Sequence, residues 1–245
     1  MTSRLRTFSK PGAVLALVAA LVGVAAQAAT VSGTVQLKDS GVEAVNKRRD
    51  YSGVVVSLQP VNQPPAPAAR RAVVLQKNKT FTPHILTVVA GTTVDFPNSD
   101  PIFHNAFSSY SGQIFDVGLY PPGTSRSVRF VRPGVVRVFC NIHPSMSAVI
   151  LVLNTPWFTT TAKDGSFQLD VPPGTYEVNV FHERSTQNTL QSLTQRIVVT
   201  EGPRKMLAPI LISEAGFLHA PHKNKYGKEY APVPDDKRVY PGVRN

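Results

Sequence analysis

The stretch FCNIHPSM, residues 139–146, places three metal-donor side chains in one short loop. Cys140 offers a thiol, His143 an imidazole and Met146 a thioether. Cys140 is the single cysteine of the chain, so no disulfide can form within the molecule. A loop this short can fold all three donors around one centre, and it therefore predicts a metal site.

The residues before this loop alternate in the manner of a β-strand. Val136, Val138 and Cys140 share one face of the segment 135–140, and Arg137 lies on the opposite, wetter face. Cys140 is therefore expected at the end of a strand, pointing inward.

The same alternation extends outward over residues 72–153, which predict a compact β unit. Turn residues such as Ala90-Gly91 and Arg132-Pro133-Gly134 separate its segments. The expected strands are Ala72–Leu75, His84–Val89, Thr92–Pro97, Arg126–Val131, Val135–Phe139 and Ala148–Leu153.

A second imidazole, His104, lies upstream in this unit and would have to be brought to the loop by the fold. Two imidazoles, one thiolate and a weak thioether form the ligand set of copper electron-transfer sites. Structural zinc would favour four strong donors, usually with more cysteines. Each residue alone also has an ordinary role in a core or on a surface. Their combination and spacing favour the metal.

Residues 72–153 resemble the cupredoxins, particularly amicyanin-like members with a short Cys-x-x-His-x-x-Met loop. The resemblance implies a Greek-key β-sandwich with one copper ion per chain, held by His104, Cys140, His143 and Met146. It also implies that Asn105 ties the two ligand loops together and supports the sulfur. The long stretch 108–122 departs from the family and leaves the rim of the site open.

The flanking segments carry a second resemblance. TTTAKDGSFQLDVPPGTYEVNV, residues 159–180, is similar to the carboxypeptidase regulatory-like (transthyretin-like) sandwich. That family opens with strands such as those at Val31–Val35 and Gly53–Leu58. Residues 29–62 and 154–213 are therefore expected to form one small sandwich, with the cupredoxin domain inserted into it. Three independent units in a row are the simpler alternative.

The remaining segments predict export, a linker and a tail. Residues 1–28 have basic residues, an apolar run and an Ala26-Gln27-Ala28 cleavage site, as in a signal peptide; an uncleaved anchor is the alternative. Residues 63–71 predict an extended linker. Residues 214–245 lack periodicity and predict a disordered tail, in which His219 and His222 would be incidental. No segment after the signal is apolar enough to span a membrane.

Composition fits an all-β, exported protein. The chain has 21 prolines, 16 glycines and 17% charged residues, which favours many turns over long helices. Losing the three basic residues of the signal lowers the formal net charge of +11 by three, to +8. A basic surface favours anionic partners, such as an acidic redox protein, lipid head groups or polyanions. Nucleic acid is not expected, because no binding motif is present.

These features predict a one-electron carrier in the periplasm or outside the cell, and no enzymatic activity. The sequence has no phosphate-binding glycine loop and no nucleophile motif. It also lacks the His-x-His pairs that a multicopper oxidase needs. Two alternatives remain: a copper carrier or storage module without electron transfer, and an adhesion or scaffold protein.

Overall fold

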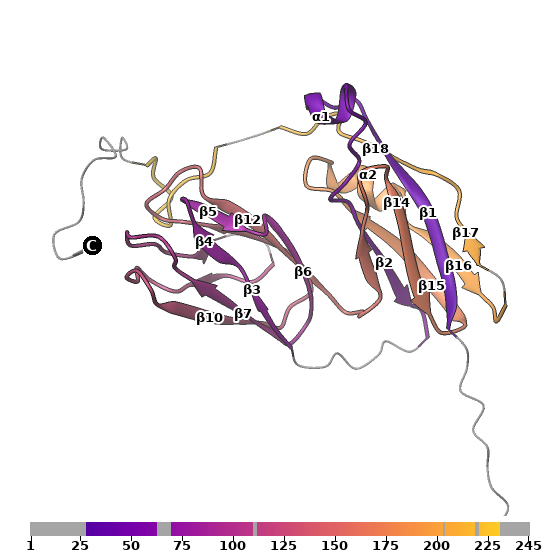
Figure 1. The fold of residues 1–245 in the computed structure, drawn as a ribbon, viewed down its shortest axis with the longest axis horizontal. Coiled ribbons are helices and arrows are strands. Elements are labelled where there is room, and N and C mark those ends of the chain that lie inside the picture. Colours follow the sequence, from indigo (N-terminus) through magenta and orange to yellow (C-terminus); the bar gives the residue numbers. More distant parts are fainter. Residues whose placement is uncertain (1–27, 63–69, 110–111, 203, 219–220, 231–245) are drawn as a thin grey trace, which may run out of the picture.

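The computed structural model describes residues 28–62, 70–109, 112–202, 204–218 and 221–230. The predicted all-β class is confirmed: two β-sandwiches lie side by side (Figure 1). Residues 1–27 of the predicted signal, 63–69 of the linker and 231–245 of the tail lie outside the described residues. Within the described part, no helix is long and apolar enough to cross a membrane.

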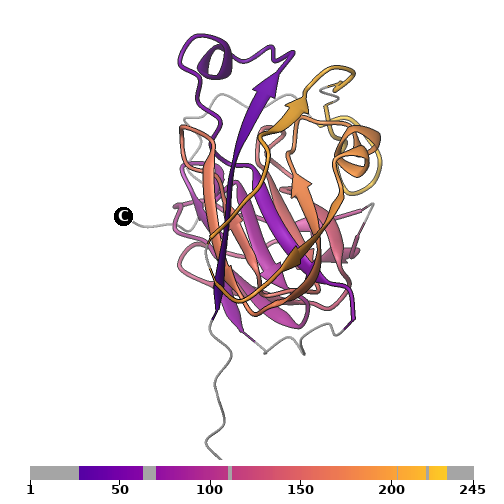
Figure 2. The same cartoon turned by 90° about the vertical axis from the view of Figure 1, so that its right-hand side faces the viewer.

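The flanking sandwich is built from both ends of the chain. One sheet has the order β14-β1-β17, with β18 also paired to β1, and the other has the order β13-β2-β15-β16. Figure 2, which looks onto this sandwich, shows the indigo N-terminal strand beside the orange later strands. Its elements are β1 (Ala29–Lys38), α1 (Glu43–Asn46), β2 (Val55–Pro60), β13 (Phe158–Thr160), β14 (Ser166–Val171), β15 (Gly174–Phe181), α2 (Gln187–Ser192), β16 (Gln195–Val199), β17 (Lys205–Met206) and β18 (Ile210–Ser213).

Alternating apolar residues join these distant segments into one core. β1 runs antiparallel to β14, with Val31 opposite Leu169, and β2 runs antiparallel to β15, with Val56 opposite Val180. All four side chains are buried in one cluster. Alternate residues of a strand face the same side, so each strand can bury one row of apolar side chains between the two sheets.

The central sandwich is built from residues 71–153. Its two main sheets have the orders β10-β7-β3 and β6-β12-β11-β8-β9, and β4 and β5 form a hairpin. Its strands are β3 (Arg71–Val73), β4 (Leu75–Lys77), β5 (Thr80–Thr82), β6 (Ile85–Val89), β7 (Thr92–Pro97), β8 (Phe107–Ser108), β9 (Phe115–Asp116), β10 (Ser125–Phe130), β11 (Gly134–Phe139) and β12 (Ser147–Leu153). Between these sheets lies a second, separate core.

Some elements differ from the sequence-based expectation. The alternation of residues 206–212 favours one strand, but the structure has two, β17 and β18, and Pro209, which has no backbone N–H to donate, lies in the gap. The helices α1 and α2 were not predicted. Helix α2 begins after Thr186, whose hydroxyl accepts a hydrogen bond from the Thr189 amide at the N-cap.

The described residues of the predicted disordered tail also differ from the expectation. Glu214 accepts hydrogen bonds from Ser40 and Arg184 and is paired with the buried His182. In Figure 1 the yellow residues that follow positions 219–220, which are outside the described residues, lie at the central sandwich. Residues 221–230 then contact the central sandwich through hydrogen bonds and ring stacking. Hydrogen bonds and single stacked rings do not require regularly spaced apolar residues, so no periodicity in the sequence indicates these contacts.

Candidate metal centre

The strand β11 delivers Cys140 to the core. Val136 and Val138 are fully buried, and so is Cys140 directly after the strand. The loop that follows is closed by its own backbone. The Cys140 amide donates to the Met146 carbonyl at 3.2 Å, and the Met146 amide donates to the His143 carbonyl at 3.1 Å. The three loop donors are therefore held in one tight turn.

His104 is held beside this loop by backbone pairing. The amide and carbonyl of His104 pair with those of Tyr120, at 3.2 and 2.9 Å. Tyr120 is fully buried, and its hydroxyl donates to the Phe96 carbonyl at 2.9 Å. A little further on, Phe107 of β8 pairs with Phe139 of β11. These pairings place the His104 loop against the strand that carries Cys140.

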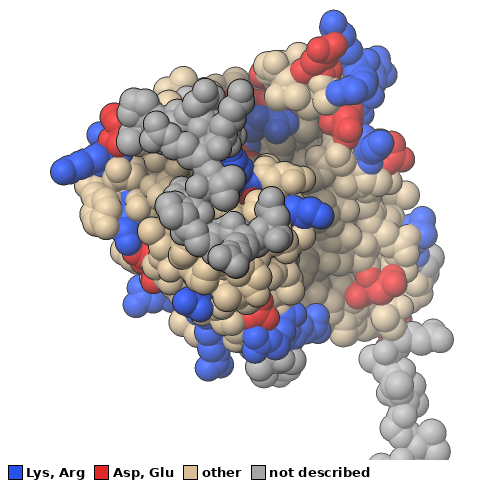
Figure 3. Space-filling view, turned by 60° about the vertical axis from the view of Figure 1, so that its left-hand side comes forward, with Lys and Arg blue, Asp and Glu red and all other residues tan. Residues whose placement is uncertain are grey.

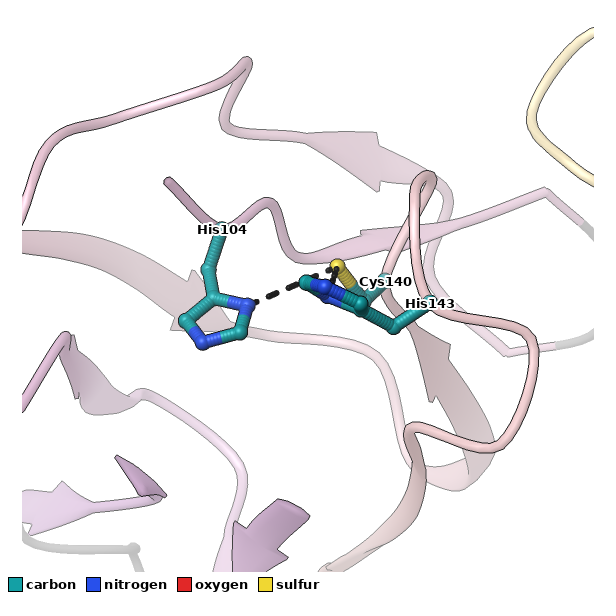
Figure 4. Close-up of side chains that lie close together, drawn as sticks. All are labelled: His104, Cys140 and His143. Carbon is teal, nitrogen blue, oxygen red and sulfur yellow. Dashed lines mark hydrogen bonds between the residues drawn. The ribbon is translucent and has the colours of Figure 1, made fainter. Parts of the chain in front are cut away.

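The three strong donors converge on one point. The Cys140 Sγ lies 3.5 Å from the His143 Nδ1 and 3.9 Å from the His104 Nδ1, and all the donor atoms lie within 4.8 Å of one another. Figure 4 shows the three side chains turned toward each other. Donors that share one ion at bond lengths of about 2.0–2.3 Å stand roughly 3–4 Å apart. The spacing and the donor types therefore fit a single metal ion.

Met146 lies in the same buried core cluster as Cys140, and its side chain has no exposed surface. A thioether is a weak, soft donor, which suits the axial position of a copper site better than a zinc site. The thioether thus lies in the same buried core cluster as the thiol that the two imidazoles approach. Within the described residues, His104, Cys140 and His143 form the one group of histidine, cysteine and acidic side chains suited to holding a metal.

Burial sets the protonation of the donors in the metal-free protein. It raises the pKa of the Cys140 thiol, against the opposing hydrogen bonds from the backbone amides of Ile142, Asn105 and His143. It lowers the pKa of His104, although the neighbouring carboxylate of Asp100 favours the charged ring. His104 is thus a neutral ligand near pH 7, whereas a metal must displace the proton of Cys140.

Asp100 is a functional residue that the sequence did not indicate. Its Oδ2 lies 2.8 Å from the His104 Nε2 and accepts from the Lys79 amide at 2.8 Å, while its Oδ1 accepts from the Asn78 amide at 2.6 Å. Burial opposes its ionisation, but these hydrogen bonds together lower the pKa of Asp100. The carboxylate therefore holds a proton on the His104 Nε2 and leaves the Nδ1 lone pair facing Cys140.

Asn105 lies between the two ligand loops. Its side-chain amide donates to Asp116 Oδ1 at 2.8 Å and to the Gly118 carbonyl at 2.9 Å. Its Oδ1 accepts from the Asn141 amide at 3.3 Å, next to Cys140. The side chain therefore connects the His104 loop to the residue that follows the cysteine.

Of the two tail histidines, His219 lies outside the described residues. The His222 ring is stacked on Phe139, with ring centroids 4.0 Å apart. It therefore lies against the residue that precedes Cys140, and it does not belong to the His104–Cys140–His143 cluster.

Comparisons with known proteins find matches among solved structures. No protein-family model and no curated protein matches the chain. A purple cupredoxin from Nitrosopumilus maritimus is 24% identical over 34% of this chain and 99% of its own, with a TM-score of 0.31. A reduced copper(I) form of an amicyanin mutant is 21% identical over 40% and 98%, with a TM-score of 0.33. A copper-containing nitrite reductase from Thermus scotoductus is 27% identical over 39% and 25%, with a TM-score of 0.31.

Proposed function

We propose that this chain is a mononuclear type 1 copper protein that carries single electrons. The observation that carries the proposal is the convergence of the His104 Nδ1, Cys140 Sγ and His143 Nδ1 within 4.8 Å in a buried site. Met146 would supply the weak fourth ligand. Copper bound there would provide a one-electron couple.

The burial of the donors favours electron transfer over metal delivery. A delivery site needs donors that an acceptor protein can reach and exchange with. Here Cys140, His104 and Met146 have no exposed surface, and His143 retains 9%. The ligand loop is also closed by its own backbone hydrogen bonds. Buried, fixed donors would slow the exchange of the metal and limit the change in ligand geometry between the two oxidation states. His143, the one donor with exposed surface, would offer the shortest path for an electron from a partner.

The visible spectrum of the copper-loaded protein tests this proposal. We expect an intense blue or green thiolate-to-copper(II) charge-transfer band and a reversible one-electron couple in voltammetry. The reason is that a thiolate, held in a fixed site with two imidazoles, is a strong and soft donor to copper(II). Absence of the band would refute the type 1 site. A band without a reversible couple would instead support the copper-carrier alternative.

We also propose that the protein is exported and that its redox partner is acidic. The basic start of the chain, the apolar run over residues 12–26 and the Ala26-Gln27-Ala28 site support export. The net charge of +8 without the three basic residues of the signal supports an anionic partner. Figure 3 shows Lys and Arg side chains distributed over one face of the molecule, with fewer Asp and Glu. A positive surface accelerates encounters with an acidic protein at low salt.

A further part of the proposal concerns architecture: a regulatory-like sandwich whose loop contains the cupredoxin domain. The pairing of β1 with β14 and of β2 with β15 supports this arrangement. The ends of the central segment also lie close together. The Thr155 hydroxyl donates to the Leu58 carbonyl at 2.7 Å, so residues on either side of the insert are in direct contact.

Fragments of the chain test the arrangement. Residues 72–153 should unfold cooperatively on their own, whereas 154–213 should not fold, because β14 and β15 would lose their partner strands and expose an apolar face. A fusion of 29–62 to 154–213 through a short linker is the control, and it should fold. Circular dichroism during thermal unfolding measures all three. Cooperative unfolding of 154–213 alone would contradict the arrangement.

A further inference from the structure

The segment 221–230 contacts the backbone of the cysteine ligand itself. The Tyr230 hydroxyl donates to the Cys140 carbonyl at 2.8 Å. Because this hydroxyl has one proton, it accepts at its 3.0 Å contact with the His222 Nδ1. The His222 ring in turn stacks on Phe139 with an interplanar angle of 25°. Through Tyr230 and His222, the segment 221–230 therefore contacts both Phe139 and Cys140, where strand β11 meets the ligand loop.

A second set of contacts closes a ring around the two ligand loops. The Lys225 amide donates to Asn141 Oδ1 at 3.0 Å, and the Lys225 ammonium contacts Asp116 Oδ2 at 2.7 Å. Asp116 accepts from Asn105, which accepts from the Asn141 amide. Asn105, Asp116, Lys225 and Asn141 therefore form a closed circuit of hydrogen bonds, and Lys225 is the member that the tail contributes.

We propose that residues 221–230 form an intramolecular clamp that positions the Cys140 loop of the metal site. The clamp fixes the Cys140 carbonyl and the Asn141 side chain, which belong to the first two residues of the ligand loop. This inference rests on the proposed copper function. Partners of this kind, which hold metal ligands from outside, typically change metal affinity by about 10–100-fold when they are removed.

The charges of the clamp suit this role near neutral pH. The hydrogen bond to Asp116 raises the pKa of Lys225, so the ammonium stays charged. Burial raises the pKa of Tyr230, so the phenol keeps the proton that it donates. The Lys225–Asp116 pair is partly exposed and contributes little alone. The positioning effect comes from several contacts that share one short segment.

A pair of conservative variants tests the clamp. Tyr230→Phe removes the hydroxyl that contacts Cys140. Tyr226→Phe removes a hydroxyl from the same segment on a residue that is 69% exposed; it keeps the ring beside the Lys225 ammonium and the stronger contact of Lys225 with Asp116. We measure the rate at which the copper(I) form of each protein loses its metal to a chelator. The visible band is recorded on the copper(II) form. Tyr230→Phe should lose copper about 2–10-fold faster and shift the band. Tyr226→Phe should match the wild type.

Removal of residues 221–245 gives the larger effect, about 10–100-fold faster loss of copper. Amide hydrogen exchange of residues 140–146 in the metal-free protein provides a readout that does not depend on copper. It should speed up in the truncated protein and in Tyr230→Phe, but not in Tyr226→Phe. Unchanged amide exchange in both the truncated protein and Tyr230→Phe would overturn the clamp, even if the wild-type protein shows the visible copper band. Faster exchange in a protein that shows no copper band would support the clamp and refute the copper function.

Discussion

Replacing Cys140 with serine will abolish the visible band of the copper-loaded protein completely. A serine hydroxyl does not ionise at neutral pH and is a harder, poorer donor than a thiolate, so the charge-transfer transition has no source. The change leaves no large cavity, because the two side chains are close in size. Absorption spectroscopy of the copper(II) protein measures the loss, and thermal unfolding of the metal-free variant confirms that it still folds.

Met146→Leu is the matched control for that loss. The methionine side chain is fully buried in the core with Cys140, and leucine conserves most of its volume, so the cost in folding free energy should stay below about 1.5 kcal/mol. The band should persist and the reduction potential should rise, because a donor to copper(II) has been removed. Met146→Gln should lower the potential instead. A band that survives in Cys140→Ser would contradict the assignment of the thiolate.

The cysteine loop and its strand could be predicted because they are local. The alternation Val136, Val138, Cys140 fixes which side of the sheet the sulfur faces, and the structure buries all three. The nearness of His104 could only be inferred from the resemblance. It depends on the pairing of His104 with Tyr120, which no periodicity in the sequence encodes.

Asp100 and the clamp could not be predicted, for different physical reasons. On a helix, a carboxylate four residues before a histidine lies beside it. Here both residues lie outside helices and named strands, so their spacing in the sequence does not predict that the two side chains meet. The clamp binds through a lysine, two aromatic rings and backbone groups. A segment that docks through such contacts has the composition of a disordered tail. The signal that was present, aromatic residues and histidine within a lysine-rich segment, is not specific.

Asp100→Asn should raise the reduction potential of the bound copper. The carboxylate lies across the imidazole ring of His104 from the Nδ1 that faces Cys140, and its negative charge would stabilise copper(II) more than copper(I) in the proposed site. A unit charge at such a separation contributes about 1–3 kcal/mol at an effective dielectric constant of about 20. For one electron this corresponds to roughly 40–130 mV. A redox titration of the copper-loaded variant at neutral pH measures the shift.

The variant should also lose stability, because asparagine cannot replace both oxygens of Asp100. The Asn78 amide, the Lys79 amide and His104 all donate to this carboxylate, so the new NH2 group must face at least one other donor. Leaving a buried donor unsatisfied costs about 1–3 kcal/mol. Asp95→Asn is the control for charge, since Asp95 pairs with Arg71 and Ser127 in the same sandwich, and its potential should change little. Equal shifts in the two variants would show that net charge sets the potential and that the contact of Asp100 with His104 does not.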